Sequence, residues 1–544
     1  SLGADPSITA LSYPYDQTVF PLGLASPLLM WTAPKNGDLY RVHLEENGYA
    51  YDGYFKPTTQ AQVRALQDNW DHLTASNLGD QVKLTLSRYD ASSHVAYDSA
   101  KQSWTIANAS LRGAIYYWTT SGTGHLARIR PGTGAAPEVM DDGNQAADAP
   151  AKKNCMGCHA VSADGNTLVA SVESRTSIDE GSAAQNSTGG TGSLNQRRAW
   201  VSFALPAGTQ GTVSNRFAGN LAVTPDGKYT VFGSVKLHVA TTANGSEITN
   251  SGLDNYVPAA GMAGLMTPAF SPDGKKFIAV QGVHGTGHFN WYDTLQGGNL
   301  ELFTFNPATG LFSGATALAS ASSFPAGEQA INYPTFSPDS NLVAFNVGAA
   351  VDGCQGTCLG TEAQGNSGVW VQTTAGATPI RLTALNDSSL NSADRDLSYE
   401  PTFNPVARGN YFWVVFSSER DWGNRITGTA NNDKKRLWVA AIDATTGTTD
   451  PSHPAFFLEG QEENTSNMRG FWSLAACTAS GPAPGGSCSA GFECCSGFCD
   501  RGTCVDVSTL SCQGDGDSCK VTADCCNAGA VSCQGGKCVP GNPR

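Results

Sequence analysis

Charged residues and long apolar runs are both scarce in this chain of 544 residues. Only 15% of the residues are charged, and 33 basic against 47 acidic side chains give a formal net charge of −14. An acidic chain is a poor partner for nucleic acid or an anionic membrane surface, so neither partner is expected. No apolar run reaches the roughly 18 residues that a membrane-spanning helix needs. The chain begins at Ser1 without a signal peptide, which we interpret as a mature or trimmed product.

Glycine and cysteine are abundant instead. The 61 glycines, with many Ser and Thr residues, favour strands and turns over long helices, so we expect an all-β protein of several domains. Of the 16 cysteines, 12 follow Ala476. Such density is typical of secreted modules stapled by disulfides, and it predicts an extracellular or periplasmic location.

One short motif carries most of the predicted chemistry. Cys155-Met156-Gly157-Cys158-His159 reads Cys-x-x-Cys-His, the attachment signature of a c-type haem. Two thiols at this spacing can each form a thioether to the porphyrin, and the histidine then becomes the proximal iron ligand. An ordinary disulfide or half a zinc site are the alternatives. The adjacent His159, and the lack of a second cysteine pair at zinc-finger spacing, favour one covalent haem c.

Residues 1–111 show strand-like segments separated by Pro and Gly, with apolar residues at helical spacing between Val63 and Leu73. We expect a separate β-sandwich with one packed helix, serving as a spacer or partner contact. Its pattern resembles the immunoglobulin-like or fibronectin-like modules that precede propellers in secreted bacterial proteins.

A repeated turn organises the middle of the chain. It reads Ser-Ala-Asp-Gly at 162–165, Thr-Pro-Asp-Gly at 224–227, Ser-Pro-Asp-Gly at 271–274, Ser-Pro-Asp-Ser at 337–340 and Asn-Pro-Val-Ala at 404–407. An apolar strand follows each turn. The repeat resembles the blade of TolB-type β-propellers, with the turn after the innermost strand.

The repeat count closes at six if both ends of the region share a blade. Ala114–Trp118 and His125–Ile129 look like the second and third strands of a blade, and Phe471–Ala476 looks like its missing inner strand. Such closure removes exposed sheet edges. A six-bladed propeller is therefore expected over 112–478.

Residues 479–544 are expected to form two cysteine-rich modules. Two successive sets of six cysteines, the first beginning at Cys477, each read Cys…Cys…Cys-Cys…Cys…Cys. Six cysteines allow fifteen pairings, and spacing alone does not choose among them. The order is similar to that of knottin modules, and this resemblance implies first-to-fourth, second-to-fifth and third-to-sixth bonds. The remaining Cys354 and Cys358 are expected to pair across a loop.

Aligning the repeats places Cys158 and His159 at the approach to the second inner strand. We therefore expect the haem across the mouth of the central channel, walled by Tyr333, Tyr399 and Trp472. Met266, His288 and His284 are the candidate sixth ligands, each weighed against a core or solvent role and against an open iron face.

Other chemistry is less strongly indicated. Asp394 and Asp396, like Asp141 and Asp142, are candidates for calcium, although solvated loop acids are the simpler interpretation. Glu400 is a candidate proton shuttle or a partner of Arg395 or Arg420.

Three functions follow from these features. The first is a secreted monohaem cytochrome that transfers electrons to a redox partner protein. The second is a haem-dependent oxidoreductase, peroxidase-like or substrate-oxidising. The third is an extracellular scaffold or filament subunit that assembles with itself or contacts a cell surface. Ligation by His and Met, or by two His, suits electron transfer, whereas an open face permits ligand binding.

Overall fold

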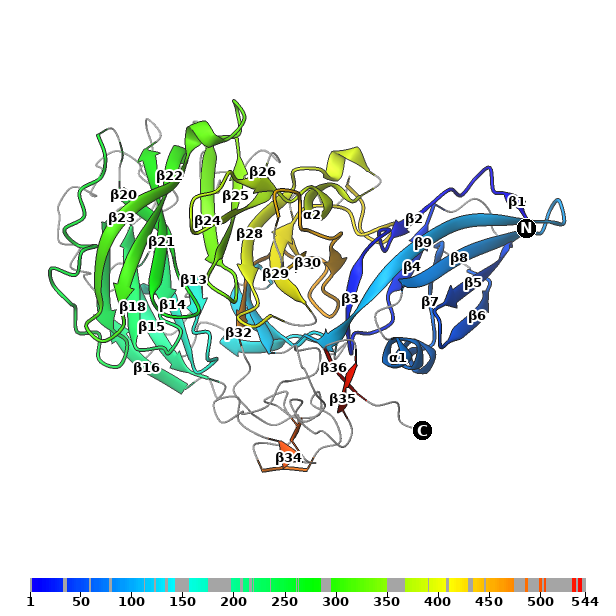
Figure 1. Ribbon diagram of the computed structural model, residues 1–544, viewed down its shortest axis with the longest axis horizontal. Helices are drawn as coiled ribbons and strands as arrows, with labels where there is room; N and C mark the ends of the chain where they lie inside the picture. Colours follow the sequence, from blue (N-terminus) through cyan, green and yellow to red (C-terminus); the bar gives the residue numbers. More distant parts are fainter. Residues whose placement is uncertain are drawn as a thin grey trace.

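The computed structural model is almost entirely β (Figure 1). It describes residues 2–473 apart from short loop gaps and the longer segments 142–155, 175–196, 285–294, 350–366 and 429–433. Beyond 473 it describes 485–487 and four short strands: β33 (Cys499–Asp500), β34 (Thr503–Cys504), β35 (Val531–Gln534) and β36 (Lys537–Pro540). None of the described helices is long and apolar enough to cross a membrane.

Six antiparallel sheets form the predicted propeller, which confirms the expected fold class. The innermost strands β13, β17, β20, β24, β28 and β32 contact one another in a closed ring. From the innermost strand outward, the first blade is β32 (Asn467–Ser473), β10 (Ala114–Thr119), β11 (His125–Ile129) and β12 (Glu138–Asp141), and the second is β13 (Met156–Val161), β14 (Thr167–Ser174), β15 (Arg197–Ala204) and β16 (Thr209–Ser214). The third blade is β17 (Asn220–Val223), β18 (Tyr229–Ser234) and β19 (Lys236–Thr241), and the fourth is β20 (Gly264–Phe270), β21 (Lys276–His284), β22 (Leu295–Asn306) and β23 (Leu311–Ser320). The fifth blade is β24 (Ala330–Phe336), β25 (Leu342–Gly348), β26 (Ser367–Thr373) and β27 (Ile380–Arg381), and the sixth is β28 (Ser398–Phe403), β29 (Tyr411–Ser418), β30 (Arg436–Asp443) and β31 (Phe456–Phe457). Short helices η2 (Ala321–Ser323), α2 (Thr383–Asp387) and η4 (Ser392–Asp394) lie in the connections.

The repeated turn has a physical basis in its hydrogen bonds. In the fourth sheet, Ser271 Oγ accepts from the N–H of Lys276 at 2.8 Å, and Asp273 Oδ1 accepts from the N–H of Lys275 at 3.0 Å. Gly274 takes a φ of 66°, which a residue without Cβ adopts at little cost. The serine therefore closes the hairpin, the aspartate caps the turn and the glycine reverses the chain.

The first blade is assembled from both ends of the propeller region. β32 pairs antiparallel with β10, with Phe471 opposite Tyr116. The strand begins at Asn467, four residues before the expected Phe471, because a bulge at 469–470 keeps the residues on both sides in register with β10. The predicted split blade is therefore present, with a longer inner strand.

Two sheets and one helix build the N-terminal module. Its larger sheet has the order β1-β9-β8-β5-β6 with β3 also on β9, and its smaller sheet has the order β2-β4-β7. The elements are β1 (Gly3–Ala4), β2 (Leu11–Tyr13), β3 (Val19–Leu22), β4 (Leu28–Trp31), β5 (Leu39–Glu45), β6 (Ala50–Phe55), β7 (Gln62–Arg64), α1 (Gln67–Ser76), β8 (Gln81–Asp90) and β9 (Val95–Ser110). Val63, which helical spacing grouped with Trp70, lies in β7 because it pairs with Leu29 of β4.

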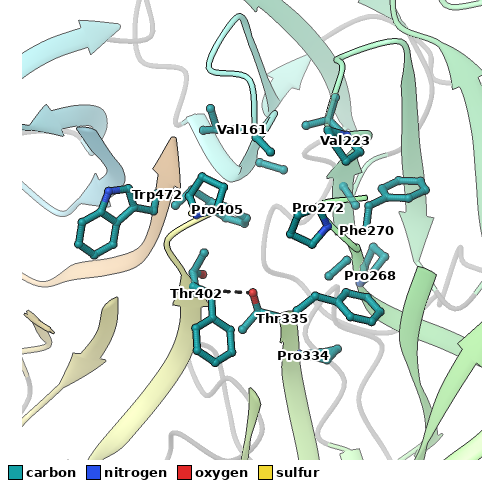
Figure 2. Close-up of a pocket in the computed structure, with 18 of the residues that line it drawn as sticks. Val161, Val223, Pro268, Phe270, Pro272, Pro334, Thr335, Thr402, Pro405 and Trp472 are labelled. Carbon is teal, nitrogen blue, oxygen red and sulfur yellow. Dashed lines mark hydrogen bonds between the residues drawn. The ribbon is translucent and has the colours of Figure 1, made fainter. Parts of the chain in front are cut away.

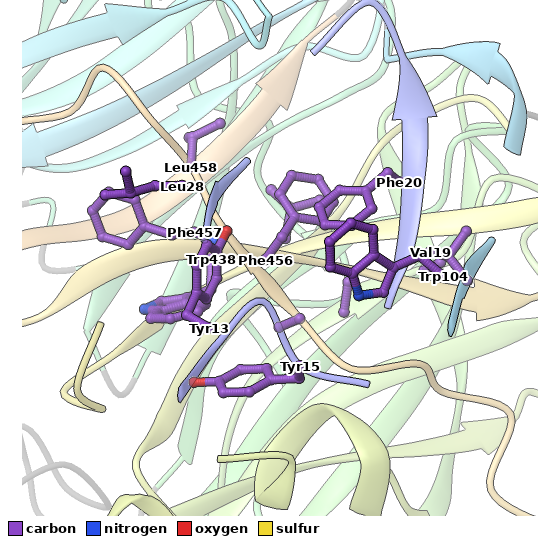
Figure 3. Close-up of a cluster of buried hydrophobic side chains, with 14 of the residues drawn as sticks. Tyr13, Tyr15, Val19, Phe20, Leu28, Trp104, Trp438, Phe456, Phe457 and Leu458 are labelled. Atoms are coloured by element: carbon purple, nitrogen blue, oxygen red, sulfur yellow. The ribbon is translucent and has the colours of Figure 1, made fainter. Parts of the chain in front are cut away.

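This module shares a hydrophobic core with the last blade (Figure 3). The ring of Tyr15 stacks on Trp438 of β30 at 6.1 Å, and Tyr13 meets the same indole edge-on at 6.1 Å. The N–H of Phe457 donates to the Tyr13 hydroxyl at 3.1 Å. Tyr13, Tyr15 and Trp438 are each at most 3% exposed, so the contact is an interior one.

The C-terminal cysteine-rich region is described only in part. Cys533 of β35 and Cys538 of β36 are both disulfide-bonded, and β33 pairs with β34 at Cys499 and Cys504. The other eight cysteines after Ala476, together with Cys354 and Cys358, lie outside the described residues. The knottin pairing stays a prediction.

Candidate functional site

The haem motif lies on the innermost strand of the second blade. β13 begins at Met156 and pairs with β14, with a bulge between Met156 and His159. Cys155 lies outside the described residues, and for Cys158 the backbone alone is described. The topology thus brings the motif to the ring of inner strands rather than to the outer edge of a blade.

His159 is enclosed between the first two blades. His159 is 1% exposed, and the centroid of its ring lies 5.1 Å from that of Phe471 on β32, edge to face. Its Nε2 lies 3.3 Å from the carbonyl oxygen of Tyr116 on β10. Because a carbonyl only accepts, Nε2–H donates this hydrogen bond and Nδ1 keeps its lone pair.

Burial also sets the charge of His159. Desolvation lowers the pKa of His159 to about 3, and the positive charge of Arg469 acts in the same direction. The imidazole is therefore neutral at any ordinary pH. A neutral ring with one N–H on a backbone carbonyl and a lone pair on the other nitrogen is the form in which histidine ligates a metal. The donor is therefore in a metal-ligating form, and Nδ1 is its free nitrogen in this orientation of the ring.

A cavity occupies the channel beside the motif (Figure 2). It contains about 740 Å³ of empty space, including the part open to solvent, and it is lined from all six inner strands and their turns. Figure 2 shows side chains from separate strands, among them Val161, Val223, Thr335 and Trp472, arranged around one opening. Ala160, the residue after His159, also lines it. The cavity and the motif are therefore neighbours.

Of the three residues predicted to wall the haem site, two line the channel cavity and one does not. Tyr333 and Trp472 both line the cavity. Tyr399 does not, because it is wholly buried: its hydroxyl donates to Glu419 at 3.3 Å, and the Lys435 ammonium lies 4.8 Å from its ring. The structure thus brings two of the three together in the channel.

Of the three candidate sixth ligands, the structure places only the side chain of Met266, and it lies apart from His159. Met266 is 4% exposed and packs in a core with Ile278 and Ile331, between the fourth and fifth blades, whereas His159 packs between the first and second. His284 ends β21, and its side chain, like all of His288, lies outside the described residues.

Four of the six inner strands have a strained residue at a bulge. Thr267, Tyr333, Glu400 and Arg469 have φ values of 46°, 49°, 53° and 51°, in the left-handed region that non-glycine residues rarely adopt. Aligned on the repeated turn, Cys158 has the same position in β13. Such strain persists only where surrounding contacts enforce it, and it gathers at functional sites.

Hydrogen bonds between blades hold this ring of bulges. The N–H of Thr267 donates to Asn220 Oδ1 at 3.0 Å, and the N–H of Glu400 donates to Asn346 Oδ1 at 3.4 Å. Glu400 Oε2 in turn accepts from the N–H of Arg469 at 2.8 Å and from Ser417 Oγ at 2.8 Å. Glu400 is therefore a link between blades rather than a partner of Arg395 or Arg420, to which no described hydrogen bond or ion pair joins it.

Arg469 is the residue that sequence reasoning missed. It lines the cavity, and its guanidinium lies 4.9 Å from the Tyr333 ring and 5.1 Å from the Phe471 ring. Its position between Met468 and Phe471, aligned with Tyr333 and Glu400, is the signal that would have found it.

The calcium candidates do not form a described site. No group of three or more His, Cys, Asp or Glu residues in the described part of the chain is placed to hold a metal ion. Asp394 accepts from the N–H of Asp421 at 3.1 Å, and Asp396 pairs with Arg381. Asp142 lies outside the described residues.

The nearby Asp421 makes folding stability depend on pH. Burial, and then the charge of Asp394, raise the pKa of Asp421 to about 6. This is above the unfolded value of about 3.9, so the associated stability is full below pH ~4 and is lost as pH rises through 6. We expect Asp421→Asn to raise the Tm at pH 7.5 by about 1–2 °C, a value discounted for partial exposure, and to leave it unchanged at pH 4. Scanning calorimetry at the two pH values checks this.

The exposed Glu45 supplies the control for Asp421. Its side chain is 54% exposed and pairs only weakly with His43 at the surface, at 3.3 Å, so Glu45→Gln should shift the Tm very little at either pH. An equal gain from Asp421→Asn at pH 4 and pH 7.5 would contradict a charge effect.

Comparisons with known proteins give fold-level likeness only. No protein-family model and no curated protein matches the sequence. Among solved structures, TolB from Acinetobacter baumannii is 14% identical, over 73% of this chain and 80% of that one, with a TM-score of 0.36. An oligogalacturonate lyase from Vibrio parahaemolyticus is 12% identical over 67% and 86% (TM-score 0.33). The β-propeller domain of the Trilobed protease from Pyrococcus furiosus is 10% identical over 52% and 68% (TM-score 0.25). The activities of these proteins are not transferred to this chain.

Proposed function

We propose that this chain carries one haem c, attached through Cys155 and Cys158 and ligated by His159, and that it transfers electrons outside the cytoplasm. The observation that carries the proposal is the state of His159. Its ring is buried and neutral, one nitrogen is held by the Tyr116 carbonyl, and the residue directly follows the second cysteine of an attachment motif.

When bound, a haem supplies one-electron chemistry at its iron. The residues of this chain would then orient and insulate it. The Tyr116 carbonyl holds one N–H of the His159 ring and so directs the other nitrogen. Phe471 packs against the ring and keeps water away from it. Burial of this kind tunes a redox potential without requiring a substrate pocket at the iron.

The rest of the chain supports a secreted protein with a redox partner. The disulfide-bonded Cys533 and Cys538 are consistent with the oxidising compartment that we propose, as is the attachment motif. A partner protein must supply and remove the electron, because the chain holds a single attachment motif.

Absorption spectroscopy of the purified full chain tests the proposal. We expect a haem that stays with the chain after denaturation and acid extraction, a reduced spectrum of a low-spin haem and no change on adding carbon monoxide. The double variant C155S/C158S should lose all covalent haem. The double variant C354S/C358S removes a cysteine pair outside the motif and should keep it.

Two outcomes would overturn parts of the proposal. A wild-type chain without covalent haem, expressed together with a haem-attachment system, would refute the haem assignment. A reduced spectrum that shifts with carbon monoxide would refute electron transfer as the function and favour a ligand-binding oxidoreductase.

A further inference from the structure

The channel cavity has an unusual distribution of charge. Its described lining consists of apolar and aromatic side chains, prolines, two threonines, one tyrosine and a single ionised residue, Arg469. Small-molecule sites likewise combine apolar and aromatic side chains with a few polar groups.

The lining offers few hydrogen-bond donors besides Arg469. Six of the lining residues are prolines, which have no backbone N–H. Thr335 Oγ accepts from the N–H of Phe403 at 3.4 Å, so its own O–H is left as a neutral donor, weaker than a guanidinium. An anionic group entering the channel would therefore find its main donor at the Arg469 guanidinium.

Aromatic faces hold the Arg469 guanidinium in place. It lies 4.9 Å from the Tyr333 ring and 5.1 Å from the Phe471 ring, both within cation–π range. In the described part of the chain, no carboxylate pairs with it and no acceptor takes a hydrogen bond from its side chain. Stacking uses the faces of a guanidinium and leaves its N–H edge available to an acceptor.

We propose that the central channel is a binding site for an organic carboxylate, whose apolar body fills the channel and whose carboxylate binds Arg469. The planar donor edge of arginine matches a carboxylate in two parallel hydrogen bonds. The apolar walls add affinity for the body of the ligand but none for its charge. A small neutral molecule of the same shape would make the apolar contacts but not the charged hydrogen bonds to Arg469, and so would bind more weakly.

The carboxylate has two possible sources. One is a free organic acid that enters the channel from solvent. The other is a propionate of the attached haem, because Phe471 contacts both the His159 ring and the Arg469 guanidinium. The inference itself stands on the cavity and Arg469 and does not require the haem.

Calorimetric titration of the full chain with benzoate, at low salt, tests the site. We expect benzoate to bind at least tenfold more tightly than benzamide, and Arg469→Gln to weaken benzoate binding by about tenfold or more, with benzamide unaffected. Arg469→Lys should restore part of the affinity. Arg425→Gln is the matched control, because Arg425 also stacks on an aromatic ring, that of Trp422, but lies outside the cavity lining.

Comparing benzoate binding by the wild-type chain and by the C155S/C158S variant identifies which of the two carboxylates occupies the site. Binding by both chains indicates a free acid, and binding by the cysteine-less chain alone indicates that a haem propionate occupies Arg469. The proposal is overturned if neither chain binds benzoate, or if Arg469→Gln binds it as well as the parent does. Thermal unfolding of each variant verifies that it is folded before titration.

Discussion

Replacing Arg88 with methionine should destabilise the N-terminal module by about 3–5 kcal/mol, the cost typical of breaking a buried ion pair. Arg88 donates to both oxygens of Asp5, at 2.7 and 2.9 Å, and to Asp38 at 2.9 Å. The three side chains are at most 2% exposed. Asp90 lies 3.6 Å from the same guanidinium, so without it three buried or nearly buried carboxylates lose their counter-charge.

The cost of Arg88→Met should also depend on pH. Burial alone would raise the pKa of Asp5, but hydrogen bonds from Arg88 and Ser99 bring it below its usual range. The stability that this carboxylate contributes is therefore present above about pH 4 and lost as pH falls through its folded-state value. In the variant the buried acid can take up a proton, so its deficit should shrink in acid.

Urea unfolding followed by tryptophan fluorescence, at pH 7 and pH 4, measures both effects. Arg41→Gln is the control, because Arg41 pairs with Asp52 at 2.6 Å on the surface of the same module, with side chains 38% and 43% exposed. Such a pair contributes at most about 1 kcal/mol. If both variants lose the same free energy of unfolding, the buried ion pairs of Arg88 stabilise the module no more than the surface pair of Arg41 does.

Trp438→Ala should cost about 3–5 kcal/mol and uncouple the N-terminal module from the propeller. The indole is wholly buried, stacks with Tyr15 and meets Tyr13 and Phe457 edge-on. The Arg420 guanidinium lies 5.3 Å from its ring. Because these contacts join the two parts, their loss should split one unfolding transition into two.

The equivalent tryptophan of the fifth blade provides the comparison. Trp370 pairs with Phe345 as Trp438 pairs with Phe416, but its ring packs on Phe324 and not on the N-terminal module. Trp370→Ala should cost less and leave a single transition in scanning calorimetry. A single transition in both variants would mean that Trp438 does not couple the two parts.

The propeller could be predicted because its signals are local and repeated. Ser271, Asp273 and Gly274 close their hairpin through hydrogen bonds within six residues, so the same letters recur wherever the same turn does. The split blade followed from counting strands, although the start of β32 depended on a bulge at 469–470 that no local pattern marks.

The surroundings of the candidate site could not be predicted, because they depend on packing between distant segments. The motif Cys155–His159 was visible, but the carbonyl of Tyr116 and the ring of Phe471 come from opposite ends of the propeller region. Arg469 has no motif of its own, and its stacking between Tyr333 and Phe471 exists only in the folded ring. The shared core at Trp438 likewise joins segments more than 400 residues apart, as the hydrogen bond from Phe457 to Tyr13 shows.

The shared first blade also sets an order of events during folding. β10 is synthesised long before β32. During that time the inner edge of β10 has no partner strand. Contacts of such long sequence separation form late and slowly. Until β32 pairs with β10, Phe471 cannot pack against the His159 ring. Ring closure therefore divides folding into two stages: before it the His159 ring lacks its Phe471 neighbour, and after it the ring is buried.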